Sequence, residues 1–210
     1  MTRMDKDFED RLAATLVATP GKNIEVPGAR RAAVLVPIVA GHDPSLIFTL
    51  RTGTVGSHRN QISFPGGALE TDESPRTAAL REAHEEIGLD PRAVRVLGEL
   101  DTTPTFVSGF VVTPVVGWLE GLPALKRNPA EVAEVLIVPL SGLSEKVRRE
   151  PGFAHLGRTY PTEGWIWEDQ VVWGVTAGLL RSLLARLAEA GLVDPPGEGS
   201  TAWSAPAVTR

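Results

Sequence analysis

One stretch of 23 residues constrains this chain more than any other feature. Residues 67–89 read GALETDESPRTAALREAHEEIGL and fit the pattern G-x5-E-x7-R-E-U-x-E-E-x-G-U at every position, where U is an aliphatic or small residue. At average residue usage, seven fixed positions match by chance on the order of once in 10^8 to 10^9 starting points. The fixed positions are Gly67, Glu73, Arg81, Glu82, Glu85, Glu86 and Gly88. Residues 67–89, the carboxylate box, are therefore treated as one functional unit.

The carboxylate box predicts a helix with two distinct faces. Ser74 offers a side-chain oxygen for the N-cap, and Pro75 suits the first helical position. Gly88 suits the left-handed residue that ends a helix. At about 100° per residue, the acidic face lies about 140° from the core face. The core face carries Leu80, Ala83 and Ile87, and the acidic face carries Glu82, Glu85 and Glu86.

The acidic face has the chemistry of a site for a hard divalent cation. Like charges at these spacings weaken an isolated helix by a few tenths of a kcal/mol per pair, roughly. Mg²⁺ is commonly held by a few carboxylates together with substrate phosphates. The neighbouring Arg81 can fix one carboxylate through a bidentate hydrogen bond. A lone acidic run would more simply be a solvated helix face, but the complete spacing favours a metal site.

The segment just before the helix predicts a strand that stops at the site. Residues 61–67 read QISFPGG, in which Ile62 and Phe64 alternate with polar neighbours, as in a half-buried strand. Pro65 then interrupts the strand, and Gly66 and Gly67 allow the backbone to approach a ligand closely. Such a backbone can offer a carbonyl to a metal or amides to a phosphate.

This arrangement resembles the Nudix hydrolases, which cleave a nucleoside diphosphate linked to some other group. The resemblance implies an α/β fold, the Nudix-type α/β/α sandwich with a mixed β-sheet, and an Mg²⁺ or Mn²⁺ cofactor. It implies that Glu73 and Arg81 assist catalysis, Glu73 through metal-bound water or by holding Arg81, and Arg81 as an orienting residue. The resemblance leaves the general base open: Glu85 is the first candidate within the box, and Glu120, Glu131, Glu134 and Glu163 are candidates outside it. The implied metal ligands are Glu82, Glu85, Glu86 and the carbonyl of Gly66.

A second resemblance narrows the substrate. Residues 51–67 read RTGTVGSHRNQISFPGG, similar to the segment R-S-x-x-L-R-x-H-x-G-Q-V-x-F-P-G-G of the coenzyme A pyrophosphatase branch. Gly56 stands where that branch has a second arginine, and Asn60 where it has glycine. The resemblance implies hydrolysis of CoA or acyl-CoA to 3′,5′-ADP and (acyl-)4′-phosphopantetheine. Substrate contacts are expected from Arg51, His58, Arg59 and Gly67.

Two alternatives remain open at this point. The same chemistry can act on ADP-ribose, NADH or a nucleoside triphosphate, and the departures at Gly56 and Asn60 keep that alternative open. A non-catalytic Nudix module that binds a nucleotide is the second alternative, although such modules tend to lose box carboxylates and this box has lost none. Four aromatic residues are either adenine-stacking groups or core: Phe106, Trp118, Trp165 and Trp167.

Composition excludes several other classes of protein. The chain has 210 residues, no cysteine and a net charge of −5. The absence of cysteine excludes disulfides and thiolate nucleophiles and suits a cytoplasmic location. The acidic balance argues against nucleic acid as a partner, and no window is apolar enough for a membrane span. The expected partner is a small molecule, CoA or a nucleoside diphosphate derivative, with a possible homodimer.

The remaining pattern predicts one domain with helices on both faces of the sheet. We expect a single Nudix hydrolase domain over residues 1–193, with an N-terminal helix over 4–18, and a disordered tail over 194–210. Residues 158–160 and 165–167 are predicted to form a hairpin around 161–164. The last helix is predicted over 171–190, and its leucines form a stripe that is either core or a dimer surface.

Overall fold

The computed structural model describes residues 2–52, 61–105, 108–143, 147–155, 158–167 and 170–194. Within these residues, eight strands form one mixed sheet in the order β3-β2-β1-β7-β5, with β4 paired to β1, β6 to β7 and β8 to β2. Strands β1 and β7 are parallel over ten residue pairs, and the other pairs of this sheet are antiparallel. The strands are β1 (Arg30–Val39), β2 (Ser45–Arg51), β3 (Ile62–Ser63), β4 (Gly66–Ala68), β5 (Arg95–Glu99), β6 (Thr103–Pro104), β7 (Phe110–Leu119) and β8 (Val132–Pro139).

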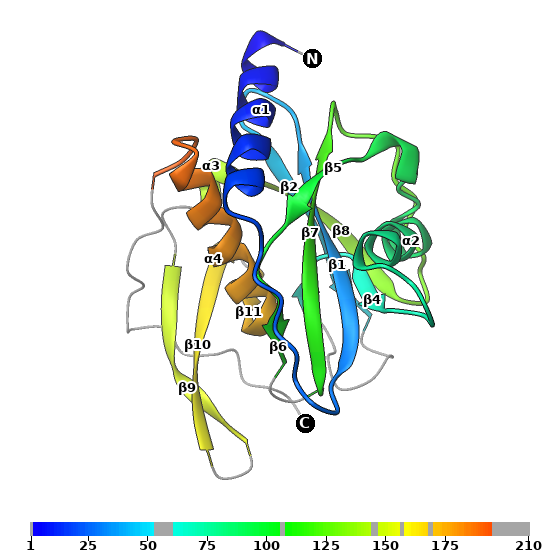
Figure 1. Ribbon diagram of the computed structural model, residues 1–210, viewed down its shortest axis with the longest axis vertical. Helices are drawn as coiled ribbons and strands as arrows, with labels where there is room; N and C mark the ends of the chain where they lie inside the picture. Colours follow the sequence, from blue (N-terminus) through cyan, green and yellow to red (C-terminus); the bar gives the residue numbers. More distant parts are fainter. Residues whose placement is uncertain are drawn as a thin grey trace.

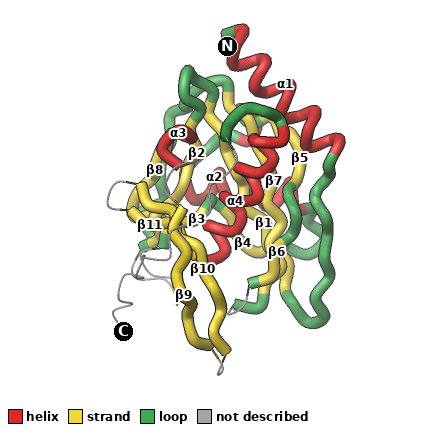
Figure 2. Tube along the Cα trace, turned by 90° about the vertical axis from the view of Figure 1, so that its left-hand side faces the viewer, coloured by secondary structure: helices red, strands yellow, loops and turns green. Residues whose placement is uncertain are grey.

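Both faces of this sheet are buried under helices. Successive side chains of a strand point to opposite faces, and β1 is apolar on both. Val36 and Ile38 belong to a core shared with α1 (Arg3–Ala18) and α4 (Gly174–Glu189). Leu35 and Val39 belong to a second core shared with α2 (Pro75–Ile87). Figure 1 and Figure 2 show α1 and α4 on one side of the sheet and α2 on the other, which confirms the predicted α/β/α sandwich.

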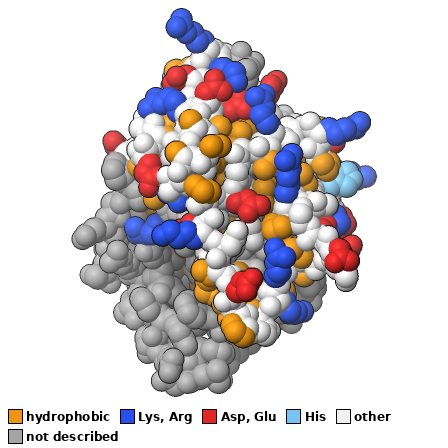
Figure 3. Space-filling view, viewed as in Figure 1, with side chains coloured by type: hydrophobic (Ala, Val, Ile, Leu, Met, Phe, Trp, Pro, Cys, Tyr) orange, Lys and Arg blue, Asp and Glu red, His pale blue; other side chains and the backbone are white. Residues whose placement is uncertain are grey.

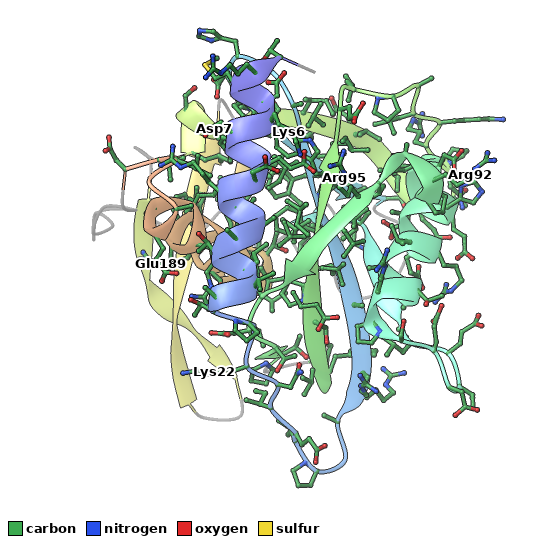
Figure 4. The ribbon with its side chains drawn as sticks, turned by 45° about the horizontal axis from the view of Figure 1, so that its top comes forward. Lys6, Asp7, Lys22, Arg92, Arg95 and Glu189 are labelled. Atoms are coloured by element: carbon green, nitrogen blue, oxygen red, sulfur yellow. The ribbon has the colours of Figure 1, made fainter. Side chains whose placement is uncertain are left out.

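The N-terminal helix α1 is fastened to the sheet by apolar and ionic contacts. Its first turn carries a capping box between Thr2 and Asp5, and Leu12 is fully buried. The carboxylate of Glu9 is buried, and its Oε1 lies 2.8 Å from Nη1 of Arg95 on β5. Figure 4 shows Arg95 on the side of α1 that carries Lys6. A short helical turn, η1 (Pro91–Ala93), leads from α2 into β5.

The predictions for the C-terminal part of the chain were partly wrong. β9 (Val147–His155), β10 (Arg158–Trp167) and β11 (Gln170–Trp173) form a separate antiparallel sheet in the order β11-β10-β9. Residues 158–167 are therefore one continuous strand, and not a hairpin turning at 161–164. The register of β10 against β9 shifts between Tyr160 and Thr162, so Pro161, which has no N–H, sits at an irregularity that does not need one.

The last helix begins later than its apolar pattern indicates. Residues 171–173 belong to β11, and α4 begins at Gly174, because these residues pair with Gly164–Ile166 of β10. The leucine stripe of α4 is buried in the core. The four-residue helix α3 (Leu140–Leu143) contributes two leucines to the same core. The members of the stripe are Leu179, Leu180, Leu183, Leu184 and Leu187. Residues 195–210 of the predicted tail lie outside the described residues.

The surface seen in Figure 3 carries acidic and basic side chains in alternation, with small apolar areas between them. This face presents no continuous basic surface. In the described part of the chain, every helix is too short or too polar to cross a bilayer.

Candidate active site

The helix of the carboxylate box is α2, and its ends are those that its sequence predicts. The Ser74 side-chain oxygen accepts a hydrogen bond from the Thr77 amide at 3.1 Å, and Pro75 is the first helical residue. Gly88 ends the helix with a φ of 67°, in the left-handed region. Ala83 and Ile87 are fully buried against the sheet. With its apolar face packed against the sheet, α2 presents its acidic face beside β4 and the end of β2.

Arg81 joins three of the box carboxylates. Its Nε and Nη2 donate to the two carboxylate oxygens of Glu73, each at 2.9 Å, in a bidentate pair. Its Nη1 donates to Oε1 of Glu82 at 2.9 Å and to Oε2 of Glu85 at 3.3 Å. The hydrogen bonds from Arg81 hold the pKa of Glu73 below its ordinary value, and a backbone hydrogen bond from Glu70 adds to this. Arg81 thus fixes the positions of carboxylates that would otherwise repel one another.

Glu86 differs from the other box glutamates because it is buried. Its side chain is 3 % exposed, and Oε2 has no hydrogen-bond partner among the described residues. Burial raises the pKa of Glu86 to about 7. The guanidinium of Arg51, whose Nη1 lies 3.6 Å from Oε1, and the backbone of Gly66 partly oppose this rise. The sequence pattern placed Glu86 on the acidic face but did not predict its burial or its contact with Arg51.

Glu82 is packed against the backbone of Gly67. A Cβ atom on residue 67 would lie 2.5 Å from Cδ of Glu82, so only glycine leaves room for this carboxylate. Burial raises the pKa of Glu82, although the hydrogen bond and the charge of Arg81 oppose that effect. Glu85, in contrast, has a side chain that is 54 % exposed. The three acidic-face glutamates therefore span a range from buried to open.

Gly66 directs its backbone polar groups away from β1. Leu35 N donates to Pro65 O at 2.8 Å, which makes Val34 and Gly66 a non-hydrogen-bonded pair of the antiparallel ladder. In such a pair the N–H and C=O groups of each residue point outward from the partner strand. The Gly66 amide favours the ionised form of Glu86, so this outward side is the side of the carboxylates. The Gly66 carbonyl consequently lies on the same side.

The loop between β7 and β8 brings a further carboxylate to the box. The amides of Lys126 and Asn128 donate to the carbonyls of Ile87 and Glu86 at 2.8 and 2.7 Å, which satisfies acceptors left free at the end of α2. Asn128 Nδ2 also donates to Oε1 of Glu131 at 3.2 Å. Burial is the main cause of the raised pKa of Glu82 and Glu86, and the negative charge of Glu131 adds to it, so this carboxylate lies near the cluster.

Glu131 was one of four candidate bases outside the box, and the structure separates it from the others. Glu120 pairs with Arg95 at 3.2 Å, on the side of β5, and Glu134 is exposed on β8. The side chain of Glu163 lies outside the described residues, as do His58 and Arg59. Asn128, which orients Glu131, was not predicted from the sequence, because that contact depends on how a distant loop meets α2.

Two of the four candidate aromatic residues are unavailable for stacking on adenine. Trp118 is 1 % exposed and Trp165 is fully buried, so both belong to the core. Phe106 and the side chain of Trp167 lie outside the described residues. Of the two alternatives for these residues, the structure thus supports core packing for Trp118 and Trp165.

The residues present fit a hard divalent cation, although the carboxylates are turned toward arginines. In the described part of the chain, no three acidic or histidine side chains converge as a ready metal cluster. Glu82, Glu85 and Glu86 instead face Arg81 and Arg51. The unpartnered Oε2 of Glu86 and the glycine cradle beneath Glu82 leave oxygen donors on one side of β4. Oxygen donors of this kind are the ligands that Mg²⁺ and Mn²⁺ take.

Comparison with known proteins identifies the family. The Nudix domain model matches residues 29–158. The uncharacterized Nudix hydrolase NudL of Cronobacter sakazakii is 40 % identical over 162 residues, covering 76 % of this chain and 84 % of that protein. NudL of Escherichia coli K12 is 36 % identical over 192 residues, covering 86 % and 94 %.

The fold also matches a solved structure. A MutT/Nudix family protein from Enterococcus faecalis, 15 % identical, superposes with a TM-score of 0.55 over 90 % of this chain and 75 % of that chain. At this identity the likeness concerns the fold alone. With the family model covering more than half of the sequence and the carboxylate box in place on α2, this chain belongs to the Nudix hydrolases, a family of pyrophosphohydrolases.

Proposed function

We propose that this chain hydrolyses the pyrophosphate bond of CoA or acyl-CoA, giving 3′,5′-ADP and (acyl-)4′-phosphopantetheine. Nudix hydrolases typically depend on a divalent metal, and the hydrolysis of a phosphoanhydride is the chemistry that the box serves. The observation that carries the CoA assignment is the position of Arg51. This residue opens the CoA-type segment 51–67, and its guanidinium lies 3.6 Å from the box glutamate Glu86. Through Arg51, the start of this segment therefore lies beside the carboxylate box.

The proposed metal ligands are Glu82, Glu85, Glu86 and the carbonyl of Gly66. Bound Mg²⁺ or Mn²⁺ would polarise the phosphoryl oxygens and lower the pKa of a bound water. Arg81 keeps the ligands in place through the hydrogen bonds described above, and Glu73 holds Arg81 from its other edge. These contacts support the assignment of Arg81 and Glu73 as orienting residues.

The base that removes a proton from the attacking water is proposed to be Glu85. Its side chain is the most exposed of the three acidic-face glutamates, so water reaches it directly. Glu131 is the second candidate, because its charge acts on Glu82 and Glu86 and its carboxylate accepts a hydrogen bond from Asn128. E85Q and E131Q distinguish the two, since loss of the base removes the corresponding limb of the pH–rate profile, whereas loss of a supporting carboxylate leaves its shape unchanged.

Arg51 is a proposed contact for the phosphates of the substrate, and its side chain is among those that the structure describes. A guanidinium binds phosphate oxygens through two parallel hydrogen bonds. His58 and Arg59 stay predictions from the resemblance, and Gly67 would offer a backbone amide.

The test is Mg²⁺- and Mn²⁺-dependent hydrolysis of a substrate panel with products identified by mass. The panel contains CoA, acetyl-CoA, dephospho-CoA, ADP-ribose, NADH and dATP. We expect CoA or acetyl-CoA to give the highest kcat/KM and 3′,5′-ADP as product. A higher kcat/KM for ADP-ribose or NADH would keep the chemistry and refute the CoA assignment. No turnover with either metal would favour the non-catalytic nucleotide-binding module.

A further inference from the structure

Arg51 is held by its backbone while its side chain remains free to change partner. Its amide donates to Gln61 O at 3.0 Å, and the residue pairs with Val132 of β8. The backbone is therefore fixed at the end of β2 between two neighbouring strands. The side chain is 27 % exposed and reaches the buried Glu86, with 3.6 Å between Nη1 and Oε1. This distance is long for an arginine–carboxylate pair, so the pair lacks a tight hydrogen bond.

A divalent cation on Glu86 would repel the guanidinium of Arg51 at its present distance from that carboxylate. Two charges of like sign a few ångströms apart repel strongly where water is partly excluded. Glu86 is buried, so the repulsion there is screened less than at the surface. Binding of the metal would therefore push the guanidinium away, and the long arginine side chain has room to turn because it is partly exposed.

We propose that Arg51 is a positioning residue that exchanges with the metal ion on Glu86. Without metal, its guanidinium compensates the buried carboxylate. With metal bound, the guanidinium turns to the anionic phosphates of the substrate. The second half of this exchange rests on the proposed function, since it requires a pyrophosphate substrate at the box, whereas the first half does not.

The exchange predicts that removing the positive charge of Arg51 strengthens metal binding. The measurement is the affinity of the full chain for Mn²⁺ without substrate, by titration calorimetry at about pH 8.5, above the pKa of Glu86. R51Q should bind Mn²⁺ more tightly by on the order of tenfold. R51K keeps the charge and should stay within about threefold of the wild type.

A matched control removes a positive charge from an exposed position on the box helix α2. Arg76 is exposed in the first turn of α2, ten residues before Glu86. R76Q should change the Mn²⁺ affinity by less than about twofold, because the charge lies farther away and is screened by solvent. Unchanged or weaker binding in R51Q would overturn the exchange, and so would equal tightening in R76Q.

A measurement on the wild-type protein tests the exchange even if R51Q does not fold. The Nε signals of the arginines are followed by nitrogen NMR during addition of Mg²⁺, and R51K identifies the signal of Arg51. Saturation with Mg²⁺ should shift that signal, and an unmoved signal would refute the exchange.

Steady-state kinetics at saturating Mn²⁺ tests the second half. R51Q should raise KM for CoA at least about tenfold, because a charge-assisted contact to phosphate is lost. An unchanged KM would refute the turn toward substrate. If the wild type does not hydrolyse CoA, the proposed function fails, while the Mn²⁺ affinities still decide the exchange between Arg51 and metal.

Discussion

Glu86 combines burial with charge in a way that a purely structural residue would not. A carboxylate that is 3 % exposed and has an oxygen without a partner among the described residues lowers the stability of the fold when it ionises. Arg51 relieves part of this cost but lies 3.6 Å away. The site thus keeps a charge ready in the protein interior, which is consistent with selection for ligand binding.

The metal-free protein should therefore lose stability as the pH rises through the titration range of Glu86. Its pKa is about 7 in the folded chain, above the value of about 4.3 in an unfolded one. The folded state favours the protonated form of Glu86. The contribution of Glu86 to the free energy of unfolding therefore falls between about pH 4.3 and 7 and is constant above that range. E86Q should raise the free energy of unfolding by about 2–3 kcal/mol at about pH 8 and change it little near pH 4.

Chemical denaturation in a metal chelator at the two pH values measures this difference. E25Q, at an exposed position in the loop before β1, is the control and should behave as the wild type at both. An equal effect of E86Q at both pH values would contradict the origin assigned to the pKa shift. In the presence of metal, the same substitution should lower turnover by at least about 100-fold.

At the scale of elements, β4 is a three-residue strand made of two functional glycines and Ala68. A Cβ atom at Gly66 would lie 2.6 Å from Cα of Val34 and closer still to the carbonyl oxygen of Ala33. Both neighbours are backbone atoms of β1, which cannot move without moving the sheet. A Cβ atom at Gly67 meets only the side-chain carboxylate of Glu82, which can rotate away. A side chain at position 66 would therefore disturb the sheet, whereas a side chain at position 67 would disturb the carboxylate site.

G66A and G67A should consequently fail in different ways. G66A should lower the free energy of unfolding by more than about 2 kcal/mol, because the backbone must shift. G67A should unfold within about 1 kcal/mol of the wild type but lose Mn²⁺ affinity, because Glu82 is displaced. Thermal unfolding and calorimetry of both variants check this, and a strongly destabilised G67A with intact metal binding would contradict it.

The elements that the sequence predicted well are those whose signals are local. Ser74, Pro75 and Gly88 set the ends of α2 through their own backbone preferences, independently of the rest of the chain. The continuous strand at 158–167 was mispredicted because Pro161 is a local strand breaker, whereas the register shift that accommodates it depends on β9. The contact of Arg51 with Glu86 and the approach of Glu131 also depend on long-range pairing, so spacing alone did not reveal them.

At the scale of the whole molecule, the N-terminal helix is attached to the sheet through an ion pair between a buried carboxylate on α1 and a half-exposed arginine on β5. Glu9 is 2 % exposed, and Arg95 is its closest cation among the described residues, at 2.8 Å. Nζ of Lys6 lies farther away, 3.9 Å from the other oxygen. Breaking such a pair from one side leaves a charge buried without its partner, which costs more than the pair itself contributes.

R95Q should therefore destabilise the protein by about 1–2 kcal/mol, because Glu9 is buried but the lost guanidinium is half exposed to solvent. E120Q removes the other, exposed carboxylate that contacts Arg95 and should cost less than about 1 kcal/mol. Urea denaturation of the two variants provides the comparison. Similar losses in both would show that Glu9 keeps water or another partner when Arg95 is shortened.

The loop that follows β7 is tied to α2 by the amides of Lys126 and Asn128, only three residues before Glu131. The three-residue spacing from Asn128 to Glu131 therefore sets how far the Glu131 carboxylate lies from the end of α2. A deletion or insertion between positions 128 and 131 would move Glu131 away from the cluster even though the sheet kept its pairing. Evolutionary changes of loop length are therefore expected upstream, in residues 120–125, where the chain can lengthen without altering the reach of that carboxylate.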